Sequence, residues 1–479
     1  MRVSRYYRLG RTQPELDFID VDVRNDVRLY VDPRALRLLP SDWGEECVSL
    51  VQNFFETVLQ AIGDGRDDDA KNLLRVLREP NETHLGLSRG QSQGRGLGYH
   101  SAVDVWEALS KSQAVQSGLL EDLEDTILMV PGISNDIISD IATNIIRAPL
   151  IAYTQETCGF YGIKLVSGVA SGPLWNPHTR QWIQHFTSLP IAQGRKLILV
   201  PKSIVRQRME YDPDEYYNQY ILEYLRDVEL SANSELVQLL RNRRRRVTKK
   251  SLREKYGTGK EAIVRETLKH PELLDQYRAD KRSQGRPPLS HEEIAAQANA
   301  EEPDFEALIE AVRAVPPGAE GANDYHRAIE NLLGPLFYPS LVNPRREFPI
   351  HQGRKRIDIQ FTNAATSGFF AWLSRHQGAA AAYVPVECKN YLRELGNPEF
   401  DQLAGRFSTN RGRFGLLVYR AYEDKERYWA SCLDTARDER GFIIPLDDED
   451  MEKLVQERIS RSWMTSFNYL HHLFERLIT

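Results

Sequence analysis

Three charged residues on two apolar segments of the C-terminal third have the types and spacing for metal-dependent chemistry. Asp358 lies in RIDIQF, and Glu387 and Lys389 lie in VECKN. Side chains at positions i and i+2 of a strand leave the same face, so Glu387 and Lys389 are predicted to lie side by side. Two carboxylates that converge from adjacent strands are the hard oxygen ligands that Mg²⁺ prefers. Bound Mg²⁺ activates a water and stabilises charge on a phosphate, and a nearby lysine neutralises developing negative charge.

The elements around these residues are predicted to form a compact α/β module with a mixed sheet. They are a helix over 325–337, strands over 355–361 and 381–391, a helix over 397–407 and a strand over 412–420. The first helix carries Glu330 and the second carries Gln402. The 28 residues between Asp358 and Glu387 must contain an inserted helix or loop, so the pairing of the two strands is a hypothesis. The alternative is that Glu387 and Lys389 form a solvated ion pair on a strand face.

This order of residues and elements resembles the PD-(D/E)xK nuclease superfamily, which has the restriction-endonuclease-like fold. The resemblance covers roughly residues 322–446, about a quarter of the chain, and departs from the family pattern in the long gap and in lacking a proline before the aspartate. It implies five active-site residues: Asp358 and Glu387 as metal ligands, Glu330 as the helix acid that supports the metal site, Lys389 as the catalytic lysine, and Gln402 as a polar residue beside them. The implied cofactor is Mg²⁺, for which Mn²⁺ can substitute.

Basic residues gather around this candidate site and in one earlier segment. Residues 341–420 contain 12 Lys and Arg against 6 Asp and Glu, and residues 241–255 contain 9 against 1. Such clusters favour contact with a nucleic-acid backbone. The residues predicted to make it are Arg354, Lys355, Arg356, Arg406, Arg411, Arg413, Arg243, Arg244, Arg245 and Arg246. For 241–255, a solvated helix surface or an oligomer contact is the alternative.

Two features of the N-terminal part are candidates for a second site. Asp136, Asp140 and Asn144 lie one helical turn apart on a helix that is otherwise apolar. This polar stripe predicts a buried polar network or a second metal or ligand-sensing site; a helix face toward solvent or a partner is the alternative. The Gly-rich stretch 88–98 is interpreted as a flexible loop or as a phosphate contact; it lacks the GK[ST] ending of a Walker A loop.

Composition predicts a soluble, cytoplasmic protein of two or three domains that does not contact a membrane. The chain has 479 residues, of which 41% are hydrophobic and 27% charged, and its formal net charge is -6. The four cysteines form no close pair, which argues against a disulfide framework or a zinc knuckle. The opening residues lack the pattern of a signal peptide, and no apolar run is long enough to span a membrane.

The predicted fold class is mixed α/β, with a larger, mainly helical N-terminal region that has a few strands. The strands include a hairpin formed by 17–23 and 28–33 around a turn at Asn25-Asp26. Pro- and Gly-rich sequence predicts a linker before the C-terminal sheet and its flanking helices. The predicted domains are an N-terminal recognition or regulatory domain (1–200), a charged helical region (201–302), the linker (303–322) and the nuclease domain (323–479).

Together these observations predict a Mg²⁺-dependent endonuclease, a hydrolase that cuts phosphodiester bonds of DNA, with RNA not excluded as a substrate. A large unfamiliar domain joined to such a nuclease resembles prokaryotic anti-phage defence or restriction effectors. Regulation by a partner protein, a small-molecule trigger or homo-oligomerisation is therefore expected. The alternatives are a non-catalytic nucleic-acid-binding or scaffold protein that retains the nuclease fold, and a protein with a nucleotide-sensing N-terminal site.

Overall fold

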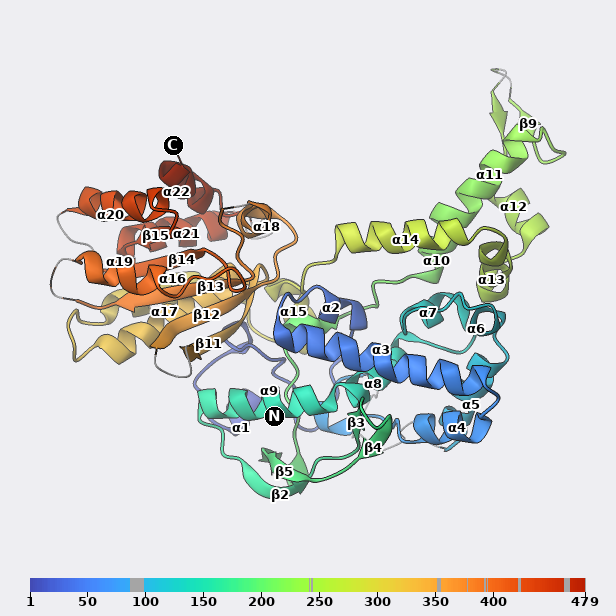
Figure 1. The fold of residues 1–479 in the computed structure, drawn as a ribbon, viewed down its shortest axis with the longest axis horizontal. Coiled ribbons are helices and arrows are strands. Elements are labelled where there is room, and N and C mark those ends of the chain that lie inside the picture. Colours follow the sequence, from blue (N-terminus) through green and yellow to red (C-terminus); the bar gives the residue numbers. More distant parts are fainter. Residues whose placement is uncertain are drawn as a thin grey trace.

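Two hydrophobic cores organise the chain, which is seen in a computed structural model (Figure 1). The structure describes residues 1–86, 99–240, 242, 244–350, 355–376, 378–391, 393, 395–420, 424–460 and 466–478. The first core contains buried residues from Val3 to Ala298 together with Tyr338, Val342 and Ala364 of the C-terminal part, and the second contains buried residues from Ile309 to Leu477. No helix in these described ranges has both the length and the apolar character needed to cross a membrane.

The N-terminal region is mainly helical and has several small two-stranded sheets. The longest helix, α3 (Asp42–Gly63), begins at Ser41, whose side chain accepts a hydrogen bond from the Gly44 amide. Its apolar positions recur at helical spacing and are buried in the first core. The other helices of eight or more residues here are α4 (Asp67–Arg75), α5 (Tyr99–Ser110), α8 (Asn135–Ile145) and α9 (Arg147–Tyr161); the shorter ones are α1 (Val3–Tyr6), α2 (Pro33–Arg37), α6 (Gln113–Gln116) and α7 (Asp125–Met129).

The small sheets of this region pair segments that are far apart or joined by short turns. The pairs are β1 (Tyr30–Val31) with β8 (Val205–Arg206), β2 (Val166–Ala170) with β5 (Phe186–Leu189), β3 (Leu174–Asn176) with β4 (Gln181–Ile183), and β6 (Ile191–Ala192) with β7 (Arg195–Lys196). The hairpin predicted around Asn25-Asp26 is wrong, because β1 pairs with a strand about 170 residues later rather than with its neighbour in sequence.

Residues 213–298 form a helical segment with an arm that projects from the body (Figure 1). Its helices are α10 (Pro213–Tyr216), α11 (Leu222–Ser231), α12 (Lys249–Tyr256), α13 (Gly259–Lys269), α14 (Pro271–Gln284) and α15 (His291–Ala298). The strands β9 (Gln238–Leu239) and β10 (Arg245–Arg246) lie near the tip. This tip and the C-terminal domain lie at opposite ends of the long axis of the molecule (Figure 1).

The C-terminal domain is built on one five-stranded mixed sheet in the order β11-β12-β13-β14-β15. Its strands are β11 (Leu341–Ile350), β12 (Lys355–Asn363), β13 (Tyr383–Lys389), β14 (Phe414–Tyr419) and β15 (Phe442–Leu446). The β11-β12 and β12-β13 pairs are antiparallel, and the other two pairs are parallel. The surrounding helices are α16 (Phe305–Ala314), α17 (Ala322–Phe337), α18 (Gly368–Arg375), α19 (Asn397–Ala404), α20 (Lys425–Arg437), α21 (Asp448–Ser460) and α22 (Asn468–Ile478). The predicted mixed α/β class, with a helical N-terminal region and a C-terminal mixed sheet, is confirmed.

The segment predicted as a linker, 303–322, contains a helix of the C-terminal domain. Ile309 and Val312 of α16 are buried in the second core, and α16 packs against α17 and α21. Pro303 and Pro316 therefore lie on either side of a packed helix. Between α15 and α16, the described residues outside helices and strands are 299–304, so the connection is short.

Candidate active site

Strand pairing brings Asp358 beside the segment that contains Glu387. Ile359 of β12 lies opposite Val386 of β13, and both are buried. One residue earlier, the Asp358 Oδ2 atom accepts a hydrogen bond of 2.9 Å from the Cys388 amide. The predicted convergence of these two strands is confirmed, and the intervening 28 residues include the short helix α18.

The Glu387 carboxylate is fully buried, and its two oxygens have different surroundings. Its Oε1 atom accepts a hydrogen bond of 2.8 Å from the Lys389 ammonium and another from the Gln402 amide. Among the described residues, nothing donates a hydrogen bond to the buried Oε2 atom. Lys389 and Gln402 are therefore brought to Glu387 as predicted, and one carboxylate oxygen remains available for a cation.

Burial and neighbouring charges shift the pKa values of this pair. Burial raises the pKa of Glu387, and the nearby Asp358 carboxylate raises it further, against the opposite effect of Lys389. Burial lowers the pKa of Lys389, but the adjacent Glu387 carboxylate outweighs that effect, so the pKa is raised overall. A buried carboxylate whose pKa is raised by burial and by a neighbouring carboxylate is typical of a functional or cation site.

Helix α17 presents a histidine to this site. His326 Nε2 donates a hydrogen bond of 3.1 Å to the Cys388 carbonyl and lies 3.9 Å from Asp358 Oδ2. Sequence analysis missed His326, although it lies four residues before Glu330 and so on the same helix face.

The carboxylate of Glu330 forms ion pairs with two arginines. Its Oε1 atom lies 3.2 Å from Arg11 of the N-terminal region, and its Oε2 atom accepts a hydrogen bond from Arg346 of β11. The side chain is only 3% exposed, so these contacts fix it in a buried position. The structure therefore gives Glu330 a role in joining the two regions of the chain, and within the described residues no hydrogen bond or ion pair joins it to Asp358 or Glu387.

A pocket of about 540 Å³ opens onto these groups. Its acidic and basic lining residues are His326, Asp358, Glu387, Lys389 and Arg393, together with Gln402. One wall is the loop around Gly318, whose amide donates a hydrogen bond of 2.8 Å to the Asn390 carbonyl. Arg393, which sequence analysis also missed, is exposed at this pocket and lies over the Tyr391 ring at 4.6 Å. In the sequence, the one indication that Arg393 lies near the site was its position four residues after Lys389.

The basic residues predicted to contact a nucleic-acid backbone have diverse surroundings. Arg406 is buried, and its charge lowers the pKa of Glu387. Arg411 Nε donates to the Arg406 carbonyl at 3.1 Å, and Arg413 donates to the Glu439 carbonyl. Arg356 is exposed on β12, whereas Arg354 lies outside the described residues, as does the side chain of Lys355.

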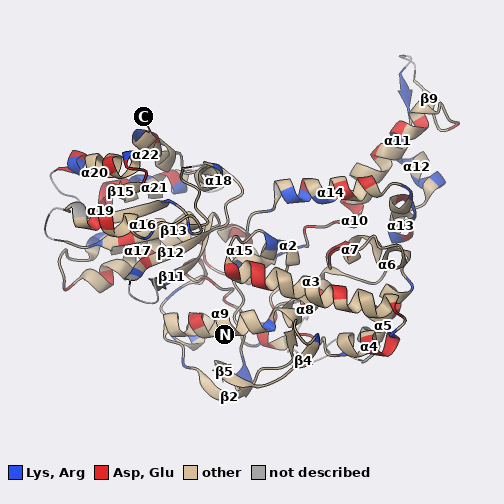
Figure 2. Ribbon diagram, viewed as in Figure 1, with Lys and Arg blue, Asp and Glu red and all other residues tan. Residues whose placement is uncertain are grey.

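Arg244, Arg245 and Arg246 are exposed near the tip of the arm, at the opposite end of the molecule from the candidate site (Figure 2). Arg243 lies outside the described residues. Given this separation, the arm and the candidate site do not form one continuous contact surface for a short nucleic acid.

The polar stripe on α8 contains a buried acid and a buried amide. Burial, and after it the charges of Asp136, Glu79 and Asp26, raise the pKa of Asp140 to about 8. Asn144 Nδ2 donates to the Arg78 and Asp140 carbonyls, and its Oδ1 accepts from Arg147 at 2.8 Å. Asn144 thus belongs to a polar network, which was one of the predicted interpretations. The Gly-rich stretch 88–98 lies outside the described residues.

Within the described ranges, no three His, Cys, Asp or Glu side chains form a ready-made metal-binding group. At the candidate active site, a cation would therefore have at most the two carboxylates Asp358 and Glu387 as acidic ligands. This number suits Mg²⁺, which binds through one or two carboxylates and keeps several waters.

Comparison with known proteins assigns no activity to the chain. The sequence model of a family described as a domain of unknown function (DUF8370) matches residues 8–212, which is less than half of the chain. No curated protein and no solved structure matches it. The matched segment ends well before the candidate active site.

Proposed function

We propose that this protein is a Mg²⁺-dependent endonuclease whose C-terminal domain hydrolyses phosphodiester bonds of DNA. The observation that carries the proposal is the buried Glu387 carboxylate, with one oxygen bonded to Lys389 and Gln402 and the other without a donor among the described residues, next to Asp358. An unsatisfied buried acceptor costs about 1–3 kcal/mol, so its retention in a pocket favours a ligand there.

The residues present fit a divalent cation. Asp358 and the free oxygen of Glu387 would hold Mg²⁺, and Mn²⁺ can replace it because both are bound by oxygen ligands. When bound, the ion would polarise a water and the scissile phosphate.

The protein's own groups would bind and orient the substrate. The raised pKa of Lys389 keeps its ammonium charged at neutral pH, where it can neutralise charge that develops on the phosphate. Gln402 contacts both the lysine and the glutamate side chains and so fixes their positions relative to each other. Arg393, exposed beside the pocket, would bind the adjacent phosphate of the strand.

The site is proposed to work in a regulated effector of prokaryotic anti-phage defence or restriction, acting in the cytoplasm. The pairing of Arg11 with Glu330 supports regulation, because the N-terminal region binds the acid that the family resemblance assigns to the metal site. Arg244, Arg245 and Arg246 would then bind nucleic acid or a partner at a distance from the cleaved bond.

The test is cleavage of supercoiled plasmid DNA, and of an RNA of matched length, with Mg²⁺, Mn²⁺ or EDTA. The wild type should nick or linearise DNA only with a divalent cation, and Asp358→Ala and Lys389→Ala should reduce the rate at least 100-fold. Asp434→Ala and Lys453→Ala, at exposed positions of the same domain, are matched controls and should cleave normally. Equal cleavage by all five proteins would refute the assignment of this site. Binding of DNA without cleavage under either metal would favour the non-catalytic alternative.

A further inference from the structure

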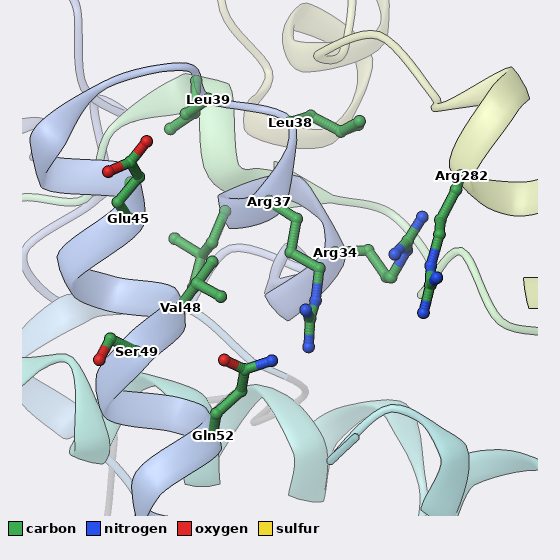
Figure 3. Close-up of a pocket in the computed structure, with 11 residues that line it drawn as sticks. Arg34, Arg37, Leu38, Leu39, Glu45, Val48, Ser49, Gln52 and Arg282 are labelled. Atoms are coloured by element: carbon green, nitrogen blue, oxygen red, sulfur yellow. The ribbon is translucent and has the colours of Figure 1, made fainter. Parts of the chain in front are cut away.

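A second pocket, of about 430 Å³, lies in the N-terminal region between α2, α3 and α14 (Figure 3). Three arginines and three aliphatic residues make up much of its lining: Arg34, Arg37 and Arg282, and Leu38, Leu39 and Val48. The polar side chains of Ser49 and Gln52 on α3 complete the wall. Figure 2 shows that the end of α14 nearest α2 is rich in basic residues.

Arg34 is a buried cation with few partners. Its side chain is 4% exposed, and its closest carboxylate oxygen, on Glu210, is 3.8 Å away. Among the described residues, its guanidinium donates no hydrogen bond; the buried Nε atom is the one that faces Glu210, so the two terminal nitrogens are the donors left for a ligand. Buried charged groups are normally paired and hydrogen-bonded, so this guanidinium has donors to offer a ligand.

The other two arginines differ in how they are held. Arg37 is fixed by Asp122 at 2.5 Å and Glu124 at 3.3 Å, which orient its side chain at the pocket wall. Arg282 is exposed in the last turn of α14, and within the described part of the chain no carboxylate lies within ion-pair distance of it. In Figure 3 the guanidinium groups of Arg34 and Arg282 lie beside one another at the same end of the pocket. Arg34, whose one ion pair is the 3.8 Å contact of Nε with Glu210, and Arg282 thus bring two guanidinium groups to one space, which is the arrangement that binds a phosphate.

The remaining lining indicates what the phosphate is attached to. Glu45 lies at the other end of the pocket from Arg282 (Figure 3). The pocket thus has a basic end, aliphatic residues and an acidic end, and its volume is that of a site for a small organic molecule. A nucleoside phosphate matches this order, with an anionic group, a flat base and base N–H donors.

We propose that this pocket binds a nucleoside phosphate, with its phosphate between Arg34 and Arg282 and its base against Leu38, Leu39 and Val48. The site joins two segments, because Arg34 lies in the part of the chain matched by the family of unknown function and Arg282 lies outside it. The proposal does not depend on the nuclease proposal, since binding is measured without cleavage.

The test is isothermal titration calorimetry of the full chain with AMP, GMP, CMP, UMP and ATP. The titrations are made in EDTA, so that the candidate nuclease site does not bind phosphates through a metal ion. Adenosine and inorganic phosphate are the partial ligands. We expect saturable binding of at least one of the nucleotides, and at least tenfold weaker binding of adenosine and of inorganic phosphate.

Arg282→Ala is the decisive variant, because the exposed side chain can be removed without unfolding the chain. It should weaken the best nucleotide at least tenfold, which corresponds to about 1.4 kcal/mol. Arg34→Met should do the same, and thermal melting shows whether that variant is folded. Arg286→Ala removes a nearby exposed arginine that does not line the pocket, and should bind as the wild type does. The proposal is overturned if the wild type binds none of the five nucleotides, or if Arg282→Ala binds with wild-type affinity.

Discussion

The substitution Glu387→Gln separates the metal-binding role of this residue from its structural role. The amide keeps the size of the side chain and an oxygen for Lys389, but removes the charge that would bind a cation. In the wild type, the buried Oε2 atom lacks a donor among the described residues, which costs about 1–3 kcal/mol. Relief of that cost by Mg²⁺ should stabilise the C-terminal domain by a similar amount, and so raise its melting temperature by roughly 2–12 °C.

The assay is differential scanning calorimetry of the wild type and Glu387→Gln, in EDTA and at several MgCl₂ concentrations. The melting temperature of the wild type should rise with MgCl₂, and that of Glu387→Gln should not. Glu310→Gln, at an exposed position on α16, is the matched control and should respond as the wild type does. The same rise in Glu387→Gln as in the wild type would refute the reasoning that Glu387 binds the ion.

The remaining predictions concern a buried acid and the contact between the two regions. Because burial raises the pKa of Asp140 from its ordinary value of 3.8 to about 8, the folded chain holds its proton more tightly than the unfolded chain. Stability should therefore fall as pH rises from about 4 to about 8 and level off above that, and Asp140→Asn should lack this component in urea unfolding at each pH. An Asp140→Asn variant with the same pH dependence as the wild type would contradict this. Arg11→Ala leaves Glu330 with Arg346 alone, and should lower the stability of the chain by about 1–3 kcal/mol in urea unfolding. Arg11→Lys should restore part of the lost stability. An Arg11→Ala variant with the same free energy of unfolding as the wild type would show that this contact does not hold the two regions together.

Period-two patterning explains why the strands of the candidate site could be predicted. Val386 and Cys388 are apolar and buried, and Glu387 and Lys389 share the other face, as the alternation required. The contact between Asp358 and the Cys388 amide then follows from the pairing of β12 with β13. The hairpin predicted in the first 33 residues failed because β1 pairs with β8, and partners that distant leave no local signal.

Local sequence patterns could not predict which of His326 and Glu330 reaches the candidate site. Both residues lie on one face of α17, so helical spacing alone allows either side chain to reach the sheet. Arg11, more than 300 residues away in sequence, binds Glu330 and fixes its carboxylate. His326 is free of that contact and bonds to the Cys388 carbonyl. The outcome depends on a partner that only the tertiary structure reveals.

Formal charge is a poor guide to which arginines can bind nucleic acid, for a related reason. The excess of 6 positive charges over residues 341–420 counts every arginine equally. In the folded chain, Arg406 is buried near Glu387, and Arg346 is bonded to Glu330, so both neutralise acids of the protein itself. Arg393 is exposed at the pocket and forms an ion pair with Glu399 at 2.9 Å, so a phosphate bound there would share this guanidinium with Glu399. The surface that meets a phosphate backbone is therefore set by the internal pairing of charges, and Arg393 is the residue whose substitution should most directly weaken substrate binding without disturbing Glu387 and Lys389.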